Sequence, residues 1–261
     1  MVGCALQCQP KLGKDLCHRT RWGRRWVVVP VQETVLVVDD DPLISNSIAF
    51  ALKQEGYAVA LAGTGQAALE EASQTHPRLV ILDVGLPDIN GVEVCRRLRR
   101  ESAVPIMFLT ARQEEVDKVV ALDAGGDEYV TKPVGIAELT ARVRAILRRS
   151  QMGETRPVTS SYHVAGVSLD VDAHRVEARG REVLLTPREF ELLLLLISNA
   201  GRAISRQEIL DRVWGSEWFG DENVVEVFVR QLRRKLEIDP DRPRLIETVR
   251  GVGYRFASDG P

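Results

Sequence analysis

The sequence predicts two folded parts: an α/β domain with a five-stranded, doubly wound parallel sheet, followed by an α+β domain. Three observations lead to this prediction. Between residues 34 and 149, short apolar runs alternate strictly with amphipathic helical patterns, and such alternation builds βαβ units. Residues 151–161 are polar and contain Gly and Pro, as is typical of a linker. Beyond them, short alternating strands and helices replace the βαβ order.

The α/β domain is expected over residues 33–150. Its strands read TVLVV, YAVALA, RLVILD, VPIMFLT and DEYVT in chain order, and a helical segment follows each of them. The first helix carries apolar residues at helical spacing, among them Ile44, Ile48 and Leu52. Strands this apolar are buried on both faces, and ligands of such sheets bind at the carboxyl ends of the strands.

The α+β domain is expected over residues 162–258. Short alternating strands come first, in HVAGVSLDVDAHRVEARGREVLLT. Helices follow in TPREFELLLLLISNAG, SRQEILDRVWG and DENVVEVFVRQLRRKLEID, and RLIETVRGVGYRFA forms a closing hairpin. Two helix starts carry a capping pattern, Thr186 with Glu189 and Ser205 with Glu208.

Composition indicates a soluble globular protein in a reducing cytoplasm. The chain has 44% apolar and 28% charged residues and a net charge of −2. Its longest apolar run, Leu192–Ile197, is far shorter than the roughly 18 residues of a membrane span. The four cysteines lack metal-site spacing and are expected to be free thiols. Residues 1–32 lack a signal-peptide pattern and are expected to be a disordered extension or an artefact of an upstream start assignment.

Polar residues gather at the strand ends of the expected parallel sheet. The residues concerned are Asp39, Asp40, Asp83, Thr110 and Lys132. Converging carboxylates repel one another unless a hard divalent cation joins them, and oxygen ligands of this kind suit Mg²⁺. A carboxylate beside Mg²⁺ can attack a phosphoryl group and form an aspartyl phosphate. A lone strand-end Asp would more often be a helix cap, but the combination favours this chemistry.

The motifs VLVVDDDP, LDVGLPDINGVEV, FLTAR and DEYVTKP resemble those of response-regulator receiver domains, and the second part resembles the winged helix-turn-helix domain of the OmpR/PhoB family. The resemblance implies that a sensor histidine kinase phosphorylates Asp83. It implies that Asp40, Asp83 and the Gly85 carbonyl hold Mg²⁺, with Asp39 acting through water. The implied ligands of the phosphoryl group are Thr110 and Lys132.

The resemblance also implies that Tyr129 is the aromatic that turns inward on activation, and that the Lys132–Pro133 bond is cis. Asp41 precedes Pro42 and is expected at the helix start rather than on the metal. Gly85 leaves the phosphoryl group without a shielding side chain, which predicts greater access of water. Val134 replaces the usual Phe after KP. The stretch GTGQAA at residues 63–68 fits a dinucleotide pattern but follows the wrong strand, so no dinucleotide is expected.

A basic run in the last helical segment, RQLRRK, predicts contact with double-stranded DNA. An apolar stripe with Val225, Phe228 and Leu232 is expected to face the core, and the hairpin tip to enter the minor groove. The candidate DNA contacts are Asn223, Arg230, Gln231, Arg233, Arg234 and Arg250. Relatives often carry other residues at Asn223, Phe228 and Gln231, which predicts a distinct target sequence. An isolated run of this kind is as often a solvated helix face.

Phosphorylation is expected to act through a homodimer on the face of the fourth helix, fifth strand and fifth helix. Charge-complementary candidates there are Lys118 with Glu138, Asp123 with Arg144, and Glu128 with Arg142. Each exposed pair contributes about 0–1 kcal/mol, so such pairs orient the partners more than they stabilise them. A solvated helix face remains the alternative interpretation of these charges.

The predicted function is that of a phosphorylation-activated transcriptional regulator that binds direct repeats as a dimer and contacts RNA polymerase. It is not expected to be an enzyme beyond its own Mg²⁺-dependent phosphorylation and dephosphorylation. One alternative is an aspartate-nucleophile phosphohydrolase, which needs an acid two residues after its nucleophile, where this chain has Gly85. A second alternative is a constitutive DNA-binding protein in which phosphorylation has no effect.

Overall fold

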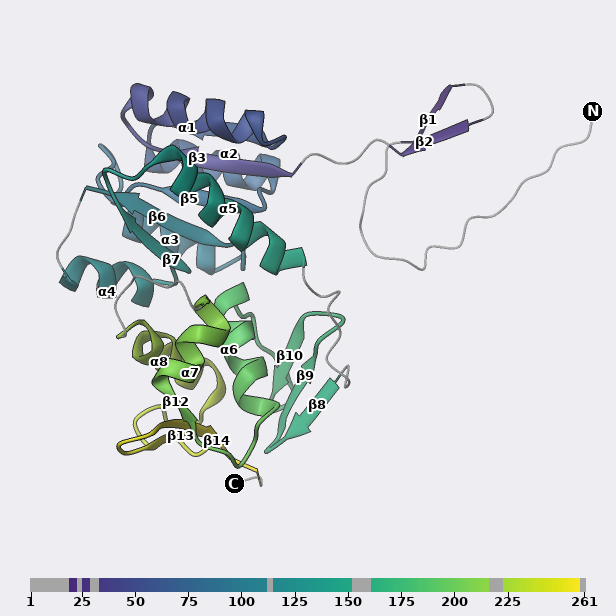
Figure 1. Ribbon diagram of the computed structural model, residues 1–261, viewed down its shortest axis with the longest axis vertical. Helices are drawn as coiled ribbons and strands as arrows, with labels where there is room; N and C mark the ends of the chain where they lie inside the picture. Colours follow the sequence, from purple (N-terminus) through teal and green to yellow (C-terminus); the bar gives the residue numbers. More distant parts are fainter. Residues whose placement is uncertain are drawn as a thin grey trace, which may run out of the picture.

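The computed structural model describes residues 19–22, 25–28, 33–111, 115–151, 161–215 and 223–258. They form an N-terminal α/β domain and a C-terminal α+β domain, seen above and below one another in Figure 1. Both parts of the predicted fold class are therefore confirmed. Most of the expected linker lies outside the described residues.

The N-terminal domain is built on a parallel sheet with the strand order β4-β3-β5-β6-β7. Its strands are β3 (Thr34–Val38), β4 (Ala58–Ala62), β5 (Leu79–Leu82), β6 (Ile106–Thr110) and β7 (Glu128–Thr131). Every residue of β5 and β6 is buried, as expected for strands covered on both faces. The strand order reverses beside β3, so β3 and β5 end next to each other.

Helices cover both faces of this sheet (Figure 1). They are α1 (Pro42–Gln54), α2 (Gly65–Thr75), α3 (Gly91–Arg99), α4 (Glu115–Asp123) and α5 (Ile136–Gln151). One core cluster joins α1 and α5 to one sheet face, and a second joins α2 and α3 to the other. The side chains of Asp41, Thr64 and Asn90 accept hydrogen bonds from backbone amides at the starts of α1, α2 and α3.

The C-terminal domain begins with an antiparallel sheet of order β11-β10-β9-β8. Its strands are β8 (Ser161–Val164), β9 (Val167–Asp170), β10 (Arg175–Ala178) and β11 (Arg181–Glu182). A second sheet, of order β12-β14-β13, closes the domain. It consists of β12 (Ile204–Ser205), β13 (Ile246–Val249) and β14 (Gly253–Phe256), and β13 and β14 form the predicted hairpin.

Helices α6 (Pro187–Ile197), α7 (Arg206–Ile209) and α8 (Val224–Leu236) pack between these two sheets. Helix α6 starts with a complete capping box, in which Thr186 and Glu189 bond each other's backbone amides. The segment predicted as one helix from Ser205 runs on from α7 as a π-helical turn, η1 (Leu210–Trp214). The apolar stripe of α8 is buried in the domain core, as predicted.

A short ribbon lies within residues 1–32, where the sequence predicts a disordered extension. Strands β1 (Arg19–Trp22) and β2 (Arg25–Val28) pair antiparallel, with Trp22 opposite Arg25. The residues Trp26, Val27 and Val28 favour extended backbone, and a two-residue spacing suits a hairpin. The other residues of this segment lie outside the described residues.

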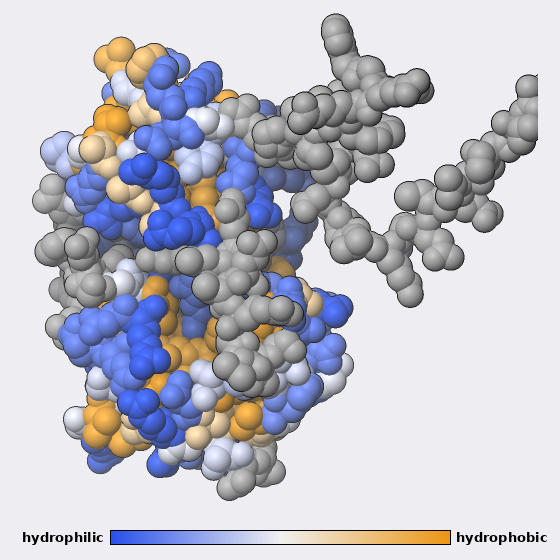
Figure 2. Space-filling view, turned by 45° about the vertical axis from the view of Figure 1, so that its right-hand side comes forward, coloured by the Kyte–Doolittle hydropathy of each residue, from blue (hydrophilic) through white to orange (hydrophobic). Residues whose placement is uncertain are grey.

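The two domains touch along α4 and α8 (Figure 1). Leu122 of α4 is 8% exposed and belongs to the hydrophobic cluster of the C-terminal domain, and Val119 and Tyr129 pack against the same cluster. On the face shown in Figure 2, hydrophobic residues reach the surface in the lower half of the molecule, with hydrophilic residues around them. A cavity of about 250 Å³ lies between the domains beside Tyr129, Asn223 and Val227.

Candidate functional site

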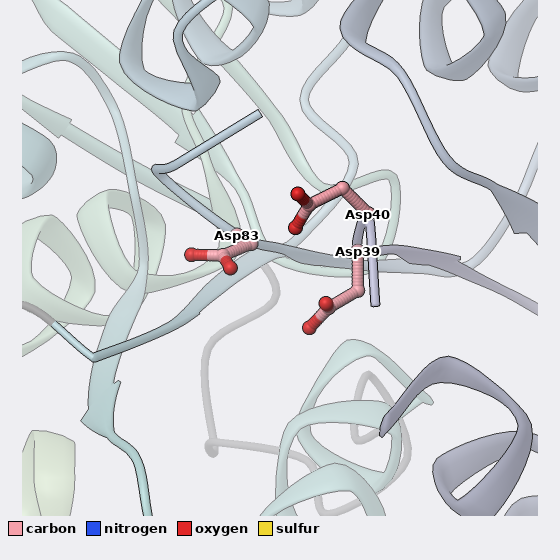
Figure 3. Close-up of side chains that lie close together, drawn as sticks. All are labelled: Asp39, Asp40 and Asp83. Carbon is pink, nitrogen blue, oxygen red and sulfur yellow. The ribbon is translucent and has the colours of Figure 1, made fainter. Parts of the chain in front are cut away.

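Three carboxylates meet where β3 and β5 end (Figure 3). Asp39 and Asp40 follow β3, and Asp83 follows β5. One oxygen from each of the three lies within 4.8 Å of the other two. Asp39 and Asp83 are buried, whereas Asp40 is exposed. The adjacency of the two strands therefore brings together residues that are more than 40 positions apart in sequence.

Lys132, which follows β7, completes this pocket. Its Nζ lies 2.6 Å from Asp39 Oδ2 and 2.8 Å from Asp83 Oδ2. Burial alone would lower the pKa of Lys132, but its hydrogen bonds and charge interactions with Asp39 and Asp83 outweigh burial and raise the pKa. The lysine is therefore a permanent cation that neutralises two buried carboxylates. The Lys132–Pro133 bond is cis, as expected.

The third aspartate of the run, Asp41, has a different task. Its side chain accepts a hydrogen bond of 2.8 Å from the Leu43 amide and caps α1. Its own amide donates to Asp39 Oδ1 at 3.0 Å, which helps to orient that carboxylate. This matches the expectation that Asp41 marks the helix start.

The remaining residues predicted for the pocket lie around Asp83. Thr110 is 2% exposed at the end of β6, the strand next to β5. The Gly85 amide donates to Asp83 Oδ1 at 3.2 Å, and a Cβ added at Gly85 would meet nothing within 4 Å. Tyr129 is half-buried on β7 opposite Phe108 of β6, with ring centroids 6.3 Å apart.

The donor set of the pocket fits a hard divalent cation. All of the side-chain ligands on offer, from Asp39, Asp40 and Asp83, are carboxylate oxygens. Mg²⁺ prefers oxygen ligands and usually keeps several bound waters. Because Asp40 is exposed, its side of the pocket has room for these waters. A cation here would share with Lys132 the task of neutralising the acidic cluster.

Helix α8 carries most of the residues predicted to contact DNA, and several of them face the N-terminal domain. Arg230 and Arg234 both bind the carboxylate of Asp123, at 3.1 Å and 3.0 Å. Gln231 lies between them, is 5% exposed, and donates to the Leu122 carbonyl oxygen. These three contacts place one side of α8 against α4.

The other predicted DNA contacts lie elsewhere in the C-terminal domain. The guanidinium of Arg233 donates to the Ile246 carbonyl oxygen at 2.7 Å and to Thr248 Oγ1 at 2.8 Å, which ties α8 to the hairpin. Burial lowers the pKa of Arg233. Arg250 is exposed at the turn between β13 and β14. Asn223 begins α8 and lines the interdomain cavity.

Most of the charges predicted to pair in a dimer make contacts within this chain. Asp123 binds the two α8 arginines instead of Arg144, and Arg144 lies 3.4 Å from Glu55, which directly follows α1. Glu128 and Arg142 pair within one chain at 2.6 Å. Lys118 and Glu138 line the same interdomain cavity.

Sequence reasoning missed a buried arginine that joins the two domains. Arg188 of α6 is 4% exposed, donates to the Val213 carbonyl oxygen, and lies 3.7 Å from Glu128 Oε2 of β7. Glu189 beside it is also buried, and burial raises the pKa of its carboxyl against the effect of Lys235 at 2.5 Å. The sequence did offer one indication of this contact, because Arg188 and Glu189 are charged residues on the otherwise apolar first turn of α6.

The comparisons with known proteins agree with this arrangement. The family model "Response regulator receiver domain" matches residues 35–144, and "Transcriptional regulatory protein, C terminal" matches residues 180–256. The sensory transduction protein RegX3 of Mycolicibacterium smegmatis is 41% identical over 85% of this chain and 98% of its own length. This chain belongs to the OmpR/PhoB family of response regulators.

Two further relatives support the assignment. The DNA-binding response regulator MtrA of Mycolicibacterium smegmatis is 43% identical over 86% of this chain and 97% of its own length. A solved structure of a RitR mutant is 30% identical, covers 87% of this chain and all of its own, and has a TM-score of 0.72. This response regulator therefore combines a receiver domain with a winged-helix DNA-binding domain and regulates transcription. Among the described residues, no helix is long and apolar enough to cross a membrane.

Proposed function

We propose that a sensor histidine kinase phosphorylates Asp83 in a Mg²⁺-dependent reaction, and that the phosphorylated chain binds direct-repeat DNA sites as a homodimer. The observation that carries this proposal is the pocket in which Asp83 lies beside two other carboxylates and 2.8 Å from Lys132. DNA as a ligand and a kinase as phosphoryl donor place this activity in the cytoplasm.

The phosphoryl transfer needs a nucleophile and neutralisation of charge. A carboxylate oxygen of Asp83 attacks phosphorus, the bond between phosphorus and the donor nitrogen breaks, and the imidazole of the kinase leaves. Lys132 binds both Asp39 and Asp83 before the reaction. Once the phosphoryl group is attached, Lys132 exchanges its contact with Asp83 for a contact with the phosphoryl oxygens. The Thr110 hydroxyl is the second ligand of the phosphoryl group.

Asp40, Asp83 and the Gly85 carbonyl would hold Mg²⁺, with Asp39 acting through water. The cation supplies charge neutralisation of the transferring phosphoryl oxygens. Asp41 does not take part, because its carboxylate caps α1. The open space beside Gly85 leaves a path by which water can reach the phosphorylated Asp83, which favours self-dephosphorylation.

Tyr129 provides the route from the pocket to the DNA-binding domain. Its side chain packs against both the receiver core and the C-terminal core, next to the interdomain cavity. Movement of Thr110 toward the phosphoryl group leaves space into which Tyr129 turns, which removes its contact with the C-terminal core. The α4–β7–α5 face then becomes free to dimerise through Lys118 with Glu138, Asp123 with Arg144, and Glu128 with Arg142.

DNA binding follows from this release. Freed α8 enters the major groove with Arg230, Gln231, Arg234 and Asn223, and Arg250 at the hairpin tip enters the minor groove. Arg233 contributes by holding α8 against the hairpin. The DNA-bound dimer presents its free surfaces to RNA polymerase.

Phosphoryl labelling tests the assignment of the pocket. The full chain is incubated with acetyl phosphate and Mg²⁺, and intact mass is measured for the wild type and for Asp83→Asn, Asp40→Asn and Asp41→Asn. We expect one phosphoryl group per wild-type chain, none on Asp83→Asn, and slowed labelling of Asp40→Asn at limiting Mg²⁺. Asp41→Asn is the matched control, because Asn caps a helix as well as Asp does. Equal labelling of the wild type and Asp83→Asn would refute the proposal.

Two rival functions make different predictions. A phosphohydrolase would turn over a phosphate ester such as p-nitrophenyl phosphate many times per chain, whereas this pocket lacks an acid at Gly85. A constitutive DNA-binding protein would bind its site equally with and without beryllofluoride at fixed salt. We expect no turnover, and tighter DNA binding with beryllofluoride.

A further inference from the structure

The carboxylate of Asp123 binds two arginines of the DNA-binding helix at once. Arg234 Nη1 lies 3.0 Å and 3.1 Å from its two oxygens, and Arg230 Nη2 lies 3.1 Å from one of them. The arginines are four residues apart, so they project from the same side of α8. About half of each arginine side chain is exposed, with values of 47% and 52%.

This geometry is that of an arginine pair on a phosphate. A guanidinium donates in the same way to the oxygens of a carboxylate and to those of a phosphate, because both anions present adjacent acceptor oxygens. Arg230 and Arg234 project from the basic side of α8, and phosphate contacts of this kind supply much of the affinity for DNA. The Asp123 carboxylate thus offers the two arginines the same kind of acceptor as a backbone phosphate.

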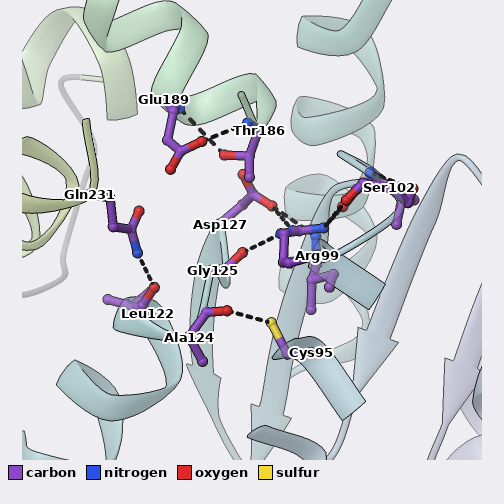
Figure 4. A network of polar contacts seen from close by, with 12 residues as sticks. Cys95, Arg99, Ser102, Leu122, Ala124, Gly125, Asp127, Thr186, Glu189 and Gln231 are labelled. Atoms are coloured by element: carbon purple, nitrogen blue, oxygen red, sulfur yellow. Dashed lines mark hydrogen bonds and ion pairs between the residues drawn. The ribbon is translucent and has the colours of Figure 1, made fainter. Parts of the chain in front are cut away.

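Neighbouring buried contacts hold Asp123 in this position. Gln231, between the two arginines, donates to the Leu122 carbonyl oxygen, and Leu122 itself is buried in the C-terminal core (Figure 4). On the receiver side, Arg99 donates to the Gly125 carbonyl oxygen at 2.8 Å and to Asp127 at 2.8 Å, which anchors the loop after Asp123. A DNA duplex cannot lie on this side of α8 while α4 covers it.

The position of Asp123 in α4 also indicates that its charge serves the contact with α8. It is the last residue of α4, where a negative charge is disfavoured by the helix dipole. Its charge therefore adds little to the stability of the receiver, and Asn would suit the helix end at least as well. The compensation for this charge comes from the two arginines across the domain boundary.

We propose that Asp123 acts as an intramolecular substitute for a DNA phosphate, which holds Arg230 and Arg234 and so competes directly with DNA for α8. This inference rests on the proposed function of α8 and adds the group that represses it. Asp123 is also the predicted dimer partner of Arg144, so one carboxylate serves either the closed monomer or the dimer. Release of Asp123 from α8 thus frees two DNA contacts and one dimer contact together.

Operator affinity in a chain that cannot be phosphorylated tests the proposal. The parent is the full chain with Asp83→Asn, to which Asp123→Asn is added, with Asp123→Ser as a second neutral variant should the first not fold. Asp172→Asn is the matched control, because it removes the same charge from the exposed turn between β9 and β10. The probe is a duplex selected from random DNA by the beryllofluoride-treated wild-type chain, and all measurements share one salt concentration.

We expect Asp123→Asn to tighten DNA binding by roughly three- to thirtyfold, as the loss of two partly exposed ion pairs allows. Asp172→Asn should remain within about twofold of the parent, since its charge acts only at long range. Equal affinities for Asp123→Asn and Asp172→Asn would overturn the proposal. Because the parent cannot be phosphorylated, failure of the phosphorylation model alone would leave the expected difference intact.

Discussion

The acidic pocket and the domain boundary each hold a group of opposite charges, and the two groups differ in what holds them together. In the acidic pocket, Lys132 binds Asp39 and Asp83 inside one domain, and both aspartates are buried. At the domain boundary, Asp123 binds Arg230 and Arg234, whose side chains are about half exposed. The first group is positioned by adjacent strands of one sheet, and the second by two helices of different domains.

This difference in burial and position suits the acidic pocket and the boundary pairs to different roles. Strand register fixes where the backbone holds the residues of the pocket, and such a preset site is suited to chemistry. The boundary pairs exist only while the domains touch, and water competes with each of them, so they are suited to a switch. A chain built in this way keeps its reactive site rigid and leaves its regulated contact weak.

The largest expected effect comes from disturbing the backbone of the pocket. A Cβ at Gly91 would lie 2.0 Å from the Asp83 carbonyl oxygen, and backbone cannot move away cheaply. We expect Gly91→Ala to destabilise the receiver by about 3 kcal/mol and to slow phosphorylation. Gly85→Ala is the control, because its Cβ meets nothing within 4 Å. Calorimetric unfolding of the full chain measures the stability of both variants. Equal unfolding temperatures for Gly91→Ala and Gly85→Ala would contradict the close approach at Gly91.

A smaller effect is expected from the buried arginine at the boundary. Arg188→Met removes the partner of the Val213 carbonyl and one contact of Glu128, and should cost about 2–3 kcal/mol. Arg202→Met offers a comparison, because Arg202 pairs with Glu208 at the surface and is 57% exposed; we expect a cost below about 0.5 kcal/mol. Chemical unfolding followed by tryptophan fluorescence distinguishes them. A similar loss in the free energy of unfolding for both variants would mean that the burial of Arg188 does not contribute to stability.

A third change weakens the boundary without altering any charge. Leu122→Ala removes an apolar side chain that is buried in the C-terminal core only while the domains touch. The loss of about 1–1.5 kcal/mol of burial should tighten DNA binding by the unphosphorylated chain about tenfold. Leu43→Ala serves as the control, because Leu43 is 79% exposed. No change in affinity would show that the contact of Leu122 does not restrain α8.

The last expected effect concerns the Cys95 thiol, which lies within the receiver domain. Burial raises the pKa of the Cys95 thiol to about 12, whereas an unfolded cysteine ionises near 8.5. Between these values the folded chain binds one proton more than the unfolded chain, so stability falls as pH rises through this window. In a variant with Cys4, Cys8 and Cys17 changed to Ser, alkylation at pH 9 should be as slow as unfolding. Rapid labelling would contradict the burial of Cys95.

The comparison also shows where sequence reasoning succeeds. The alternation of strands and helices predicts a parallel sheet, and strand ends of such a sheet converge, so Asp39, Asp83 and Lys132 could be placed together without a structure. Thr186 and Ser205 were likewise predictable, because a cap depends on residues only three positions away. Local rules of this kind cover the fold class and the composition of the pocket.

The contacts at the domain boundary could not be predicted from local rules of this kind. Asp123 and Arg234 are 111 positions apart, and their pairing depends on how two finished surfaces fit, which no local pattern encodes. Leu122 follows Ala121, which is buried in the receiver core, so α4 has apolar residues on two sides. That second apolar side was the one signal for a partner domain. The β1–β2 ribbon was missed because the sequence shows no clear hydrophobic periodicity before Val27.

In the proposed mechanism, binding at the acidic pocket and binding of DNA by α8 are coupled, and the reciprocity of this coupling can be measured. If beryllofluoride with Mg²⁺ tightens operator binding by a given factor, operator DNA must tighten beryllofluoride binding by the same factor. Fluorine NMR measures beryllofluoride affinity of the full chain with and without saturating operator. We expect equal factors in both directions and smaller factors for Asp123→Asn. Beryllofluoride affinity that does not change when operator DNA is added would contradict this coupling.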